Sequence, residues 1–140
     1  MSSFLYLLDT DIISDLVRHP VGQVYQRIKK VGEEKVCTSI IVAAELRYGI
    51  RKKGSERLTM QVETILSGFN VLPLEPPSDK YYAELRVTLE KAGMPIGPND
   101  MLIASQVMAL DLILISARSL LVGNPVFFVV GSAGSPIVRC

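Results

Sequence analysis

Three acidic residues lie where apolar stretches of the chain meet turns or helices, and they are the side chains best placed to do chemistry. Asp9 directly follows an apolar stretch over residues 4–8. Glu45 is the one residue between positions 40 and 46 that is neither apolar nor Ala, and Asp100 follows Pro98 at the start of another apolar segment. A carboxylate among apolar neighbours needs a cation, hydrogen bonds or a metal ion to offset its lost hydration.

Taken one at a time, these acids also have structural interpretations. Asp9 suits a turn or the cap of the next helix, and Asp11 suits the first turn of that helix, where the dipole favours negative charge. Asp100 fits the same description in the helix that begins at Pro98. Glu45 is compatible with a buried ion pair or with a position that faces solvent. Each residue alone therefore leaves its role open.

Considered together, the three acids favour a site for hard divalent cations. Carboxylates that lie close together repel unless a positive charge lies between them, and Mg²⁺ and Mn²⁺ prefer carboxylate and water oxygens. Two such ions can activate water and stabilise an in-line phosphodiester displacement. Ser/His/Asp or Cys/His nucleophile sets do not compete, because the single His19 precedes Pro20 in an expected loop, and Cys37 and Cys140 form no metal-binding pair.

Length and composition predict one domain with an aliphatic core. The chain has 140 residues, 49% of them hydrophobic, and no Trp. Its net charge of +1 gives no overall attraction to nucleic acid. Positive charge is concentrated at Arg47, Arg51 and Lys52, which form either a solvated helix end or a patch for RNA phosphates or a partner. No apolar run reaches the roughly 18–20 residues that span a bilayer, and the start does not resemble a signal peptide, so we expect a cytoplasmic protein.

Strand-like and helical segments alternate along the chain. Strands are expected at residues 4–8, 36–38, 70–74, 112–115 and 126–130. Helices are expected at 11–18 with Thr10 as the cap, at 21–31, at 40–53 between Ser39 and Gly54, after Ser55, at 79–92 and at 98–109. This alternation is typical of an α/β fold, a single domain with a central, mostly parallel sheet flanked by helices. Functional residues of such sheets gather at the carboxyl ends of the strands, where Asp9 lies.

Three segments closely resemble the acidic motifs of PIN-domain toxins of the VapC type. They are LLDTDIISDLV, TSIIVAAELRYGI and AGMPIGPNDMLIASQ, and their order and flanking residues match the family over roughly residues 4–116. The resemblance implies a compact α/β/α PIN fold and endoribonuclease activity that depends on Mg²⁺ or Mn²⁺. It also implies a homodimer that a cognate VapB-type antitoxin inhibits.

The same resemblance implies a role for each acid. Asp9 and Asp100 would be the principal metal ligands, and Glu45 would complete the ligand set or orient a metal-bound water. The neighbouring polar residues that would surround these ligands are Asp11, Asn99 and Ser116.

The chain departs from this family after residue 116. The family usually carries a fourth acidic or amide residue after its strand, in a pattern such as T-N-N, whereas this chain has Ser116-Ala117-Arg118. We therefore divide the chain into a PIN-like domain at 1–116 and a divergent tail at 117–140, whose expected strand would complete the sheet and whose GSAGSP segment would be flexible. The tail is interpreted as a divergent folded end or as the product of a frameshift, and loss of a fourth ligand predicts weakened activity.

Two other functions are compatible with parts of the sequence. A catalytically impaired PIN domain would still bind antitoxin or RNA, and the changed end favours this alternative. A HAD-type phosphatase would use LLDTD, with Asp9 as nucleophile and Asp11 as general acid, but Ile12 and Ile13 replace the small residues that usually follow. Transfer, ribosomal and messenger RNA all remain open as substrates of the favoured nuclease.

Overall fold

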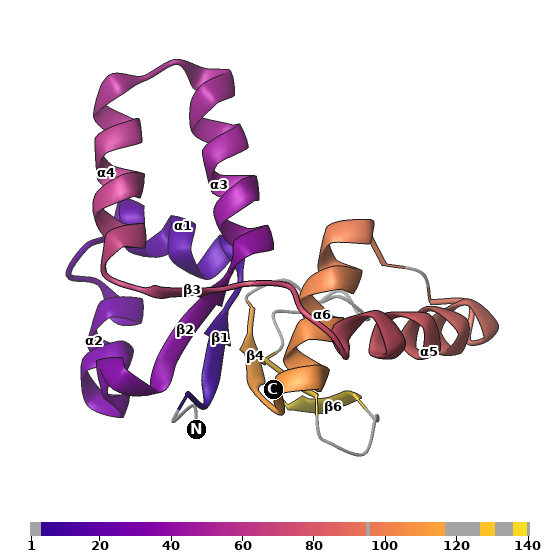
Figure 1. The fold of residues 1–140 in the computed structure, drawn as a ribbon. Helices are drawn as coiled ribbons and strands as arrows, with labels where there is room; N and C mark the ends of the chain where they lie inside the picture. Colours follow the sequence, from indigo (N-terminus) through magenta and orange to yellow (C-terminus); the bar gives the residue numbers. More distant parts are fainter. Residues whose placement is uncertain (1–3, 95, 117–126, 131–135, 140) are drawn as a thin grey trace.

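The computed structural model describes residues 4–94, 96–116, 127–130 and 136–139, and it shows a six-stranded sheet covered by helices (Figure 1). The strand order is β3-β2-β1-β4-β5-β6. The parallel strands are β1 (Tyr6–Leu8), β2 (Val36–Ser39), β3 (Asn70–Leu72) and β4 (Ile113–Ile115). Strand β5 (Phe127–Val130) runs antiparallel to β4, and β6 (Pro136–Arg139) runs antiparallel to β5.

The helices form layers on the two sides of this sheet (Figure 1). Helices α1 (Thr10–Arg18) and α2 (Gln23–Val31) lie on one side, and α5 (Ser78–Lys91) and α6 (Pro98–Leu110) lie on the other. Helices α3 (Ile40–Lys53) and α4 (Glu56–Ser67) form a hairpin that projects beyond the carboxyl ends of the strands, and a short 3-10 turn, η1 (Glu33–Lys35), precedes β2. The arrangement is the predicted α/β/α fold.

The core is centred on β1, which has a parallel neighbour on each side. Leu7 pairs with Cys37 of β2 and with Leu114 of β4, and all three side chains are buried. Full burial of a leucine side chain contributes about 1.5–3 kcal/mol to the stability of the fold. The short strands are therefore stabilised mainly by the side chains that pack against both faces of the sheet. Residues of α1, α3 and α6 cover them, with Ile13 and Ile103 almost fully buried.

Helix ends follow the predicted capping residues with one exception. Ser39 and Ser55 cap α3 and α4 by accepting hydrogen bonds from backbone N–H groups, and Gly54 ends α3 in the left-handed conformation, with φ 68°. The predicted cap of α1 was wrong, because Thr10 is the first residue of the helix and Asp9 caps it. A hydroxyl and a carboxylate both suit this position, and the carboxylate one residue earlier is the one that accepts from the helix N–H.

The predicted order of elements is confirmed, with small differences in their limits. Strands β1, β3 and β4 are shorter than predicted, α2 begins two residues later and α5 begins one residue earlier. The strand predicted at 126–130 is present as β5, whereas β6 was not predicted. The rest of the predicted tail, including Ala117, Arg118 and most of GSAGSP, lies outside the described residues. Within the part of the chain that the structure describes, no helix has the length and apolar content needed to cross a membrane.

Candidate active site

Four of the predicted site residues lie together at the carboxyl edge of the parallel strands: Asp9, Asp11, Glu45 and Ser116. Asp9 directly follows β1 and Ser116 directly follows β4, and these two strands pair side by side. The backbone N–H of Asp9 donates to the carbonyl of Ile115 at 2.9 Å, which extends the strand pairing up to the site itself. The hydrogen bonds of the sheet therefore fix the backbone at both Asp9 and Ser116.

Asp9 is a buried carboxylate whose two oxygens have different surroundings. The residue is 1% exposed. Its Oδ1 accepts a hydrogen bond from the backbone N–H of Thr10 at 2.7 Å, and its Oδ2 accepts one from the Ser116 hydroxyl at 3.0 Å. Such bonds offset part of the free energy that desolvating a carboxylate costs. Asp9 is thus both a helix cap, as one interpretation predicted, and a fixed, buried anion at the edge of the sheet.

Ser116 joins Asp9 to a second carboxylate. Its hydroxyl oxygen lies 3.5 Å from each carboxylate oxygen of Asp11, as well as 3.0 Å from Asp9. A hydroxyl carries one hydrogen, so it donates best to the nearer acceptor, Asp9. Two of the three predicted neighbours, Asp11 and Ser116, therefore lie beside Asp9, as expected from the sequence.

Glu45 reaches the same edge from α3. The side chain is half-buried, and its Oε1 accepts a hydrogen bond from the Thr10 hydroxyl at 2.8 Å. Thr10 follows Asp9 directly, so Glu45 is one residue removed from the cap of α1. The interpretation of Glu45 as part of a buried ion pair was wrong for the described residues, in which the Thr10 hydroxyl is its partner. Its intermediate exposure is compatible with the solvent-facing interpretation.

Thr10 is the residue of this site that the sequence analysis missed. The sequence predicts a local capping role for Thr10, whereas its side chain contacts a residue 35 positions away. The available signal was its place directly after Asp9, at the first position of a helix that begins at the functional edge of a parallel sheet.

Asp100 enters from the first turn of α6, as predicted. Helix α6 leads into β4, so it runs opposite to the parallel strands and begins on the side of their carboxyl ends (Figure 1). Pro98 is at the start of the helix, and the half-buried Asp100 carboxylate lies at the positive end of the helix dipole. Asn99, the third predicted neighbour, is exposed in the same turn.

The donor chemistry of this edge fits a hard cation. The Ser116 hydroxyl joins Asp9 to Asp11, and Thr10 contacts Asp9 through its backbone N–H and Glu45 through its hydroxyl. Carboxylate oxygens, the ligands that hard cations prefer, therefore lie together at this edge. Asp100 is a further carboxylate, in the first turn of α6. Within the described residues, no three His, Cys, Asp or Glu side chains lie in an arrangement that would hold a metal ion. The ligand roles of Asp9, Glu45 and Asp100 stay predictions.

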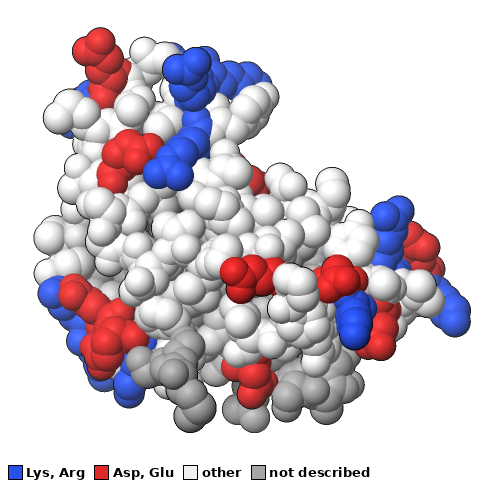
Figure 2. Space-filling view, viewed as in Figure 1, with Lys and Arg blue, Asp and Glu red and all other residues white. Residues whose placement is uncertain are grey.

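The residues of the predicted basic patch lie on the α3–α4 hairpin. Arg51 and Lys52 are exposed in the last turn of α3, which is the helix-end position that one interpretation predicted. Arg47 instead forms a two-pronged ion pair with Glu63 of α4, at 2.9 and 3.1 Å. The Arg47 guanidinium lowers the pKa of the Glu63 carboxyl, chiefly through this hydrogen bond. Figure 2 shows Lys and Arg side chains gathered at the tip of this hairpin.

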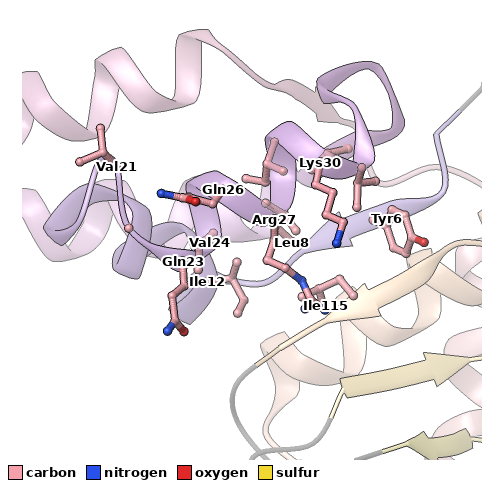
Figure 3. Close-up of a pocket in the computed structure, with 14 residues that line it drawn as sticks. Tyr6, Leu8, Ile12, Val21, Gln23, Val24, Gln26, Arg27, Lys30 and Ile115 are labelled. Atoms are coloured by element: carbon pink, nitrogen blue, oxygen red, sulfur yellow. The ribbon is translucent and has the colours of Figure 1, made fainter.

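A groove of about 1050 Å³ lies between α2 and the strands (Figure 3). Leu8 and Ile115, which line it, directly precede Asp9 and Ser116. Figure 3 shows the side chains of Arg27 and Lys30 extending from α2 toward the strands. Neither cation is in an ion pair among the described residues. The groove is therefore adjacent to the acidic edge but is lined by different residues, apolar and basic.

The sequence profile of the PIN domain matches residues 6–118. The chain belongs to the PIN domain family. The match contains every acidic residue of the edge described above, and it makes the HAD-type phosphatase alternative wrong.

Relatives within the PIN domain family are VapC proteins. Ribonuclease VapC2 of Rickettsia felis is 35% identical over 108 residues, which cover 75% of this chain and 80% of the relative. The tRNA(fMet)-specific endonuclease VapC of Shigella flexneri is 28% identical over 112 residues, covering 79% and 84%. The crystal structure of VapBC2 from Rickettsia felis bound to a promoter DNA fragment has a similar chain, with a TM-score of 0.76, 30% identity, and coverage of 82% of this chain and 89% of that one.

Proposed function

We propose that this PIN domain is a VapC-type endoribonuclease, the toxin of a toxin–antitoxin pair, and that Asp9, Glu45 and Asp100 hold Mg²⁺ or Mn²⁺ for RNA phosphodiester hydrolysis. The observation that carries the proposal is the buried Asp9 carboxylate, fixed by Ser116 and linked through Thr10 to Glu45. Carboxylate oxygens fixed in this way are the ligands that hard divalent cations prefer. The names of the VapC relatives support RNA as the substrate class.

Each side chain has a task that its surroundings support. The Thr10 N–H and the Ser116 hydroxyl hold the Asp9 carboxylate in one orientation. Thr10 holds Glu45 by Oε1, which leaves Oε2 to reach a cation or a water. A bound Mg²⁺ or Mn²⁺ would supply an activated water and would stabilise charge on the phosphate. The chain itself supplies fixed oxygen ligands.

The partners belong to the same proposal. A related chain is described in complex as VapBC2, which supports a VapB-type antitoxin as the inhibitor of this chain. We further propose a homodimer that acts in the cytoplasm, with RNA as substrate. Arg51 and Lys52 are the exposed cations proposed to contact RNA phosphates or the partner, whereas Arg47 would first have to leave Glu63.

The experiment measures cleavage of structured RNA, including initiator transfer RNA, and of unstructured RNA by the purified full chain with Mg²⁺, Mn²⁺ or a chelator. Asp9→Asn and Asp100→Asn each replace one proposed ligand. Asp111→Asn is the matched control, because Asp111 is an exposed acid at the other end of α6, in a left-handed conformation that Asn adopts readily.

We expect metal-dependent cleavage by the wild type and the Asp111 variant. Each ligand variant should lose more than about 100-fold, beyond the range typical of residues that only support a metal ligand. No cleavage by a folded wild-type chain that binds an antitoxin would favour the impaired binding domain instead. Cleavage that persists with chelator, or in both ligand variants, would contradict the proposal.

A further inference from the structure

Gln106 is a fully buried amide in the middle of α6, and every polar atom of its side chain has a partner. The residue is 0% exposed. Its Nε2 donates to the carbonyls of Leu72 and Pro73 at 3.1 and 2.9 Å, and its Oε1 accepts from the Ser39 hydroxyl. Because the nitrogen faces two carbonyls, which only accept, the orientation of the amide is fixed.

These contacts join three elements at the carboxyl edge of the sheet. Leu72 is the last residue of β3, and Ser39 is the last residue of β2. Ser39 is also the cap of α3, because its hydroxyl oxygen accepts from the backbone N–H of Ile41 at 3.0 Å. One side chain of α6 therefore holds the ends of two strands and the first turn of α3.

Ser39 and Gln106, which contact each other, are each six residues along the chain from a proposed metal ligand. Glu45 is six residues beyond Ser39 on α3, and Asp100 is six residues before Gln106 on α6, a rise of about 9 Å in each helix. Helix α3 leaves the sheet edge and α6 approaches it (Figure 1), so both acids lie beyond the contact, on its outer side. A rotation of either helix about this contact would move the two carboxylates relative to each other.

We propose that Gln106 is a positioning residue of the nuclease. Its amide holds α6 against the cap of α3 so that Asp100 and Glu45 face the same metal ion. The inference rests on the proposed function and adds a residue that touches neither metal nor RNA. Displacement of a reacting group by 1 Å can cost about 100-fold in rate, so a side chain that fixes two helices can control the site from a distance.

The test compares Gln106→Met with Val107→Ala. Methionine fills similar space without hydrogen bonds, whereas Val107 is the next residue of α6, 0% exposed, and packs in the core. Both variants lower the thermal midpoint. Metal binding is read in the RNA-free full chain by electron paramagnetic resonance, as the free Mn²⁺ concentration at half-saturation, and cleavage is read as the Mn²⁺ concentration for half-maximal rate. Both are measured at a temperature well below each midpoint of unfolding.

We expect Gln106→Met to need roughly 10-fold or more Mn²⁺ in both measurements, as for residues that orient metal ligands, whereas Val107→Ala should keep the wild-type values. Ser39→Ala removes one of the three bonds and should shift them in the same direction by less, so the proposal is tested even if Gln106→Met does not fold. Equal Mn²⁺ requirements in Ser39→Ala, Val107→Ala and wild type would overturn it. A wild type that neither cleaves RNA nor responds to Mn²⁺ would instead overturn the proposed function, and this inference with it.

Discussion

Charged side chains at the carboxyl edge of the sheet and on the α3–α4 hairpin differ in their burial and in their partners. At the edge, Asp9 is buried and contacts backbone N–H and hydroxyl groups. On the hairpin, Arg47 and Glu63 pair with each other, and about half of each side chain is exposed. An exposed pair costs little to form or lose, whereas a buried carboxylate is expensive. Burial of an acid, more than its presence, therefore distinguishes a candidate functional site from an exposed ion pair.

The interior beneath the edge should be closed to reagents in the folded protein. Cys37 of β2 is 0% exposed, and burial raises the pKa of its thiol to about 12. Since the thiolate is the reactive form, a thiol reagent at pH 8 should meet roughly 1000-fold less of it than in an unfolded chain. The stability that this thiol contributes is present below its unfolded pKa, near 8.5, and is lost as the pH rises toward 12.

Thiol labelling in a Cys140→Ser background, where Cys37 is the one remaining cysteine, checks this prediction. Reaction should become fast only in denaturant. Fast labelling of the folded chain at pH 8 would show that the strand beneath the site is open to solvent. It would contradict the claim that the sheet edge, unlike the hairpin, is closed to solvent.

The link between α1 and α3 at the edge should matter for activity. Thr10→Val keeps the shape of the side chain but removes the hydroxyl that donates to Glu45. We expect metal-dependent cleavage to fall about 10-fold, as is typical when a partner of a metal ligand is lost. Thr10→Ser retains a hydroxyl, so its cleavage rate should stay close to that of the wild type. Equal cleavage rates for the Val and Ser variants would show that the Thr10 hydroxyl has no role in the site.

The hairpin ion pair should give the smallest effect. Arg47→Ala or Glu63→Gln removes a pair whose side chains are 49% and 45% exposed, and such pairs contribute little net stability. The thermal midpoint should change by only a few degrees, less so at high salt, and the Mn²⁺ requirement of cleavage should not change. A large change in either quantity would show that the hairpin and the edge are coupled.

The ends of several helices could be predicted from the sequence. Ser39, Gly54, Ser55 and Pro98 marked helix ends correctly, because capping depends on neighbours within one turn. The alternation of apolar runs gave the parallel sheet, and hence the edge where Asp9 lies. The interpretation of Thr10 as a cap failed because Asp9, one residue earlier, meets the same requirement.

Contacts between distant residues were not readable in this way. The bond from Thr10 to Glu45 spans 35 positions, and the one from Ser39 to Gln106 spans 67. Periodicity shows which face of a helix is apolar, but not which polar atom it will meet across the fold. The acids alone left metal binding, capping and ion pairing open, and the resemblance of their three segments to PIN-domain toxins was what favoured a nuclease.

The central claim is that Asp9, Glu45 and Asp100 together form one binding site for a divalent metal ion. Mn²⁺ binding to the RNA-free chain tests this claim most directly. Free Mn²⁺ is measured by electron paramagnetic resonance during titration of the wild type, Asp9→Asn, Glu45→Gln, Asp100→Asn and the control Asp111→Asn. We predict saturable binding by the wild type and the control, and binding weakened by about 10-fold or more in each of the other three. Equal Mn²⁺ affinity in all five folded proteins, or no binding by the wild type, would contradict the account.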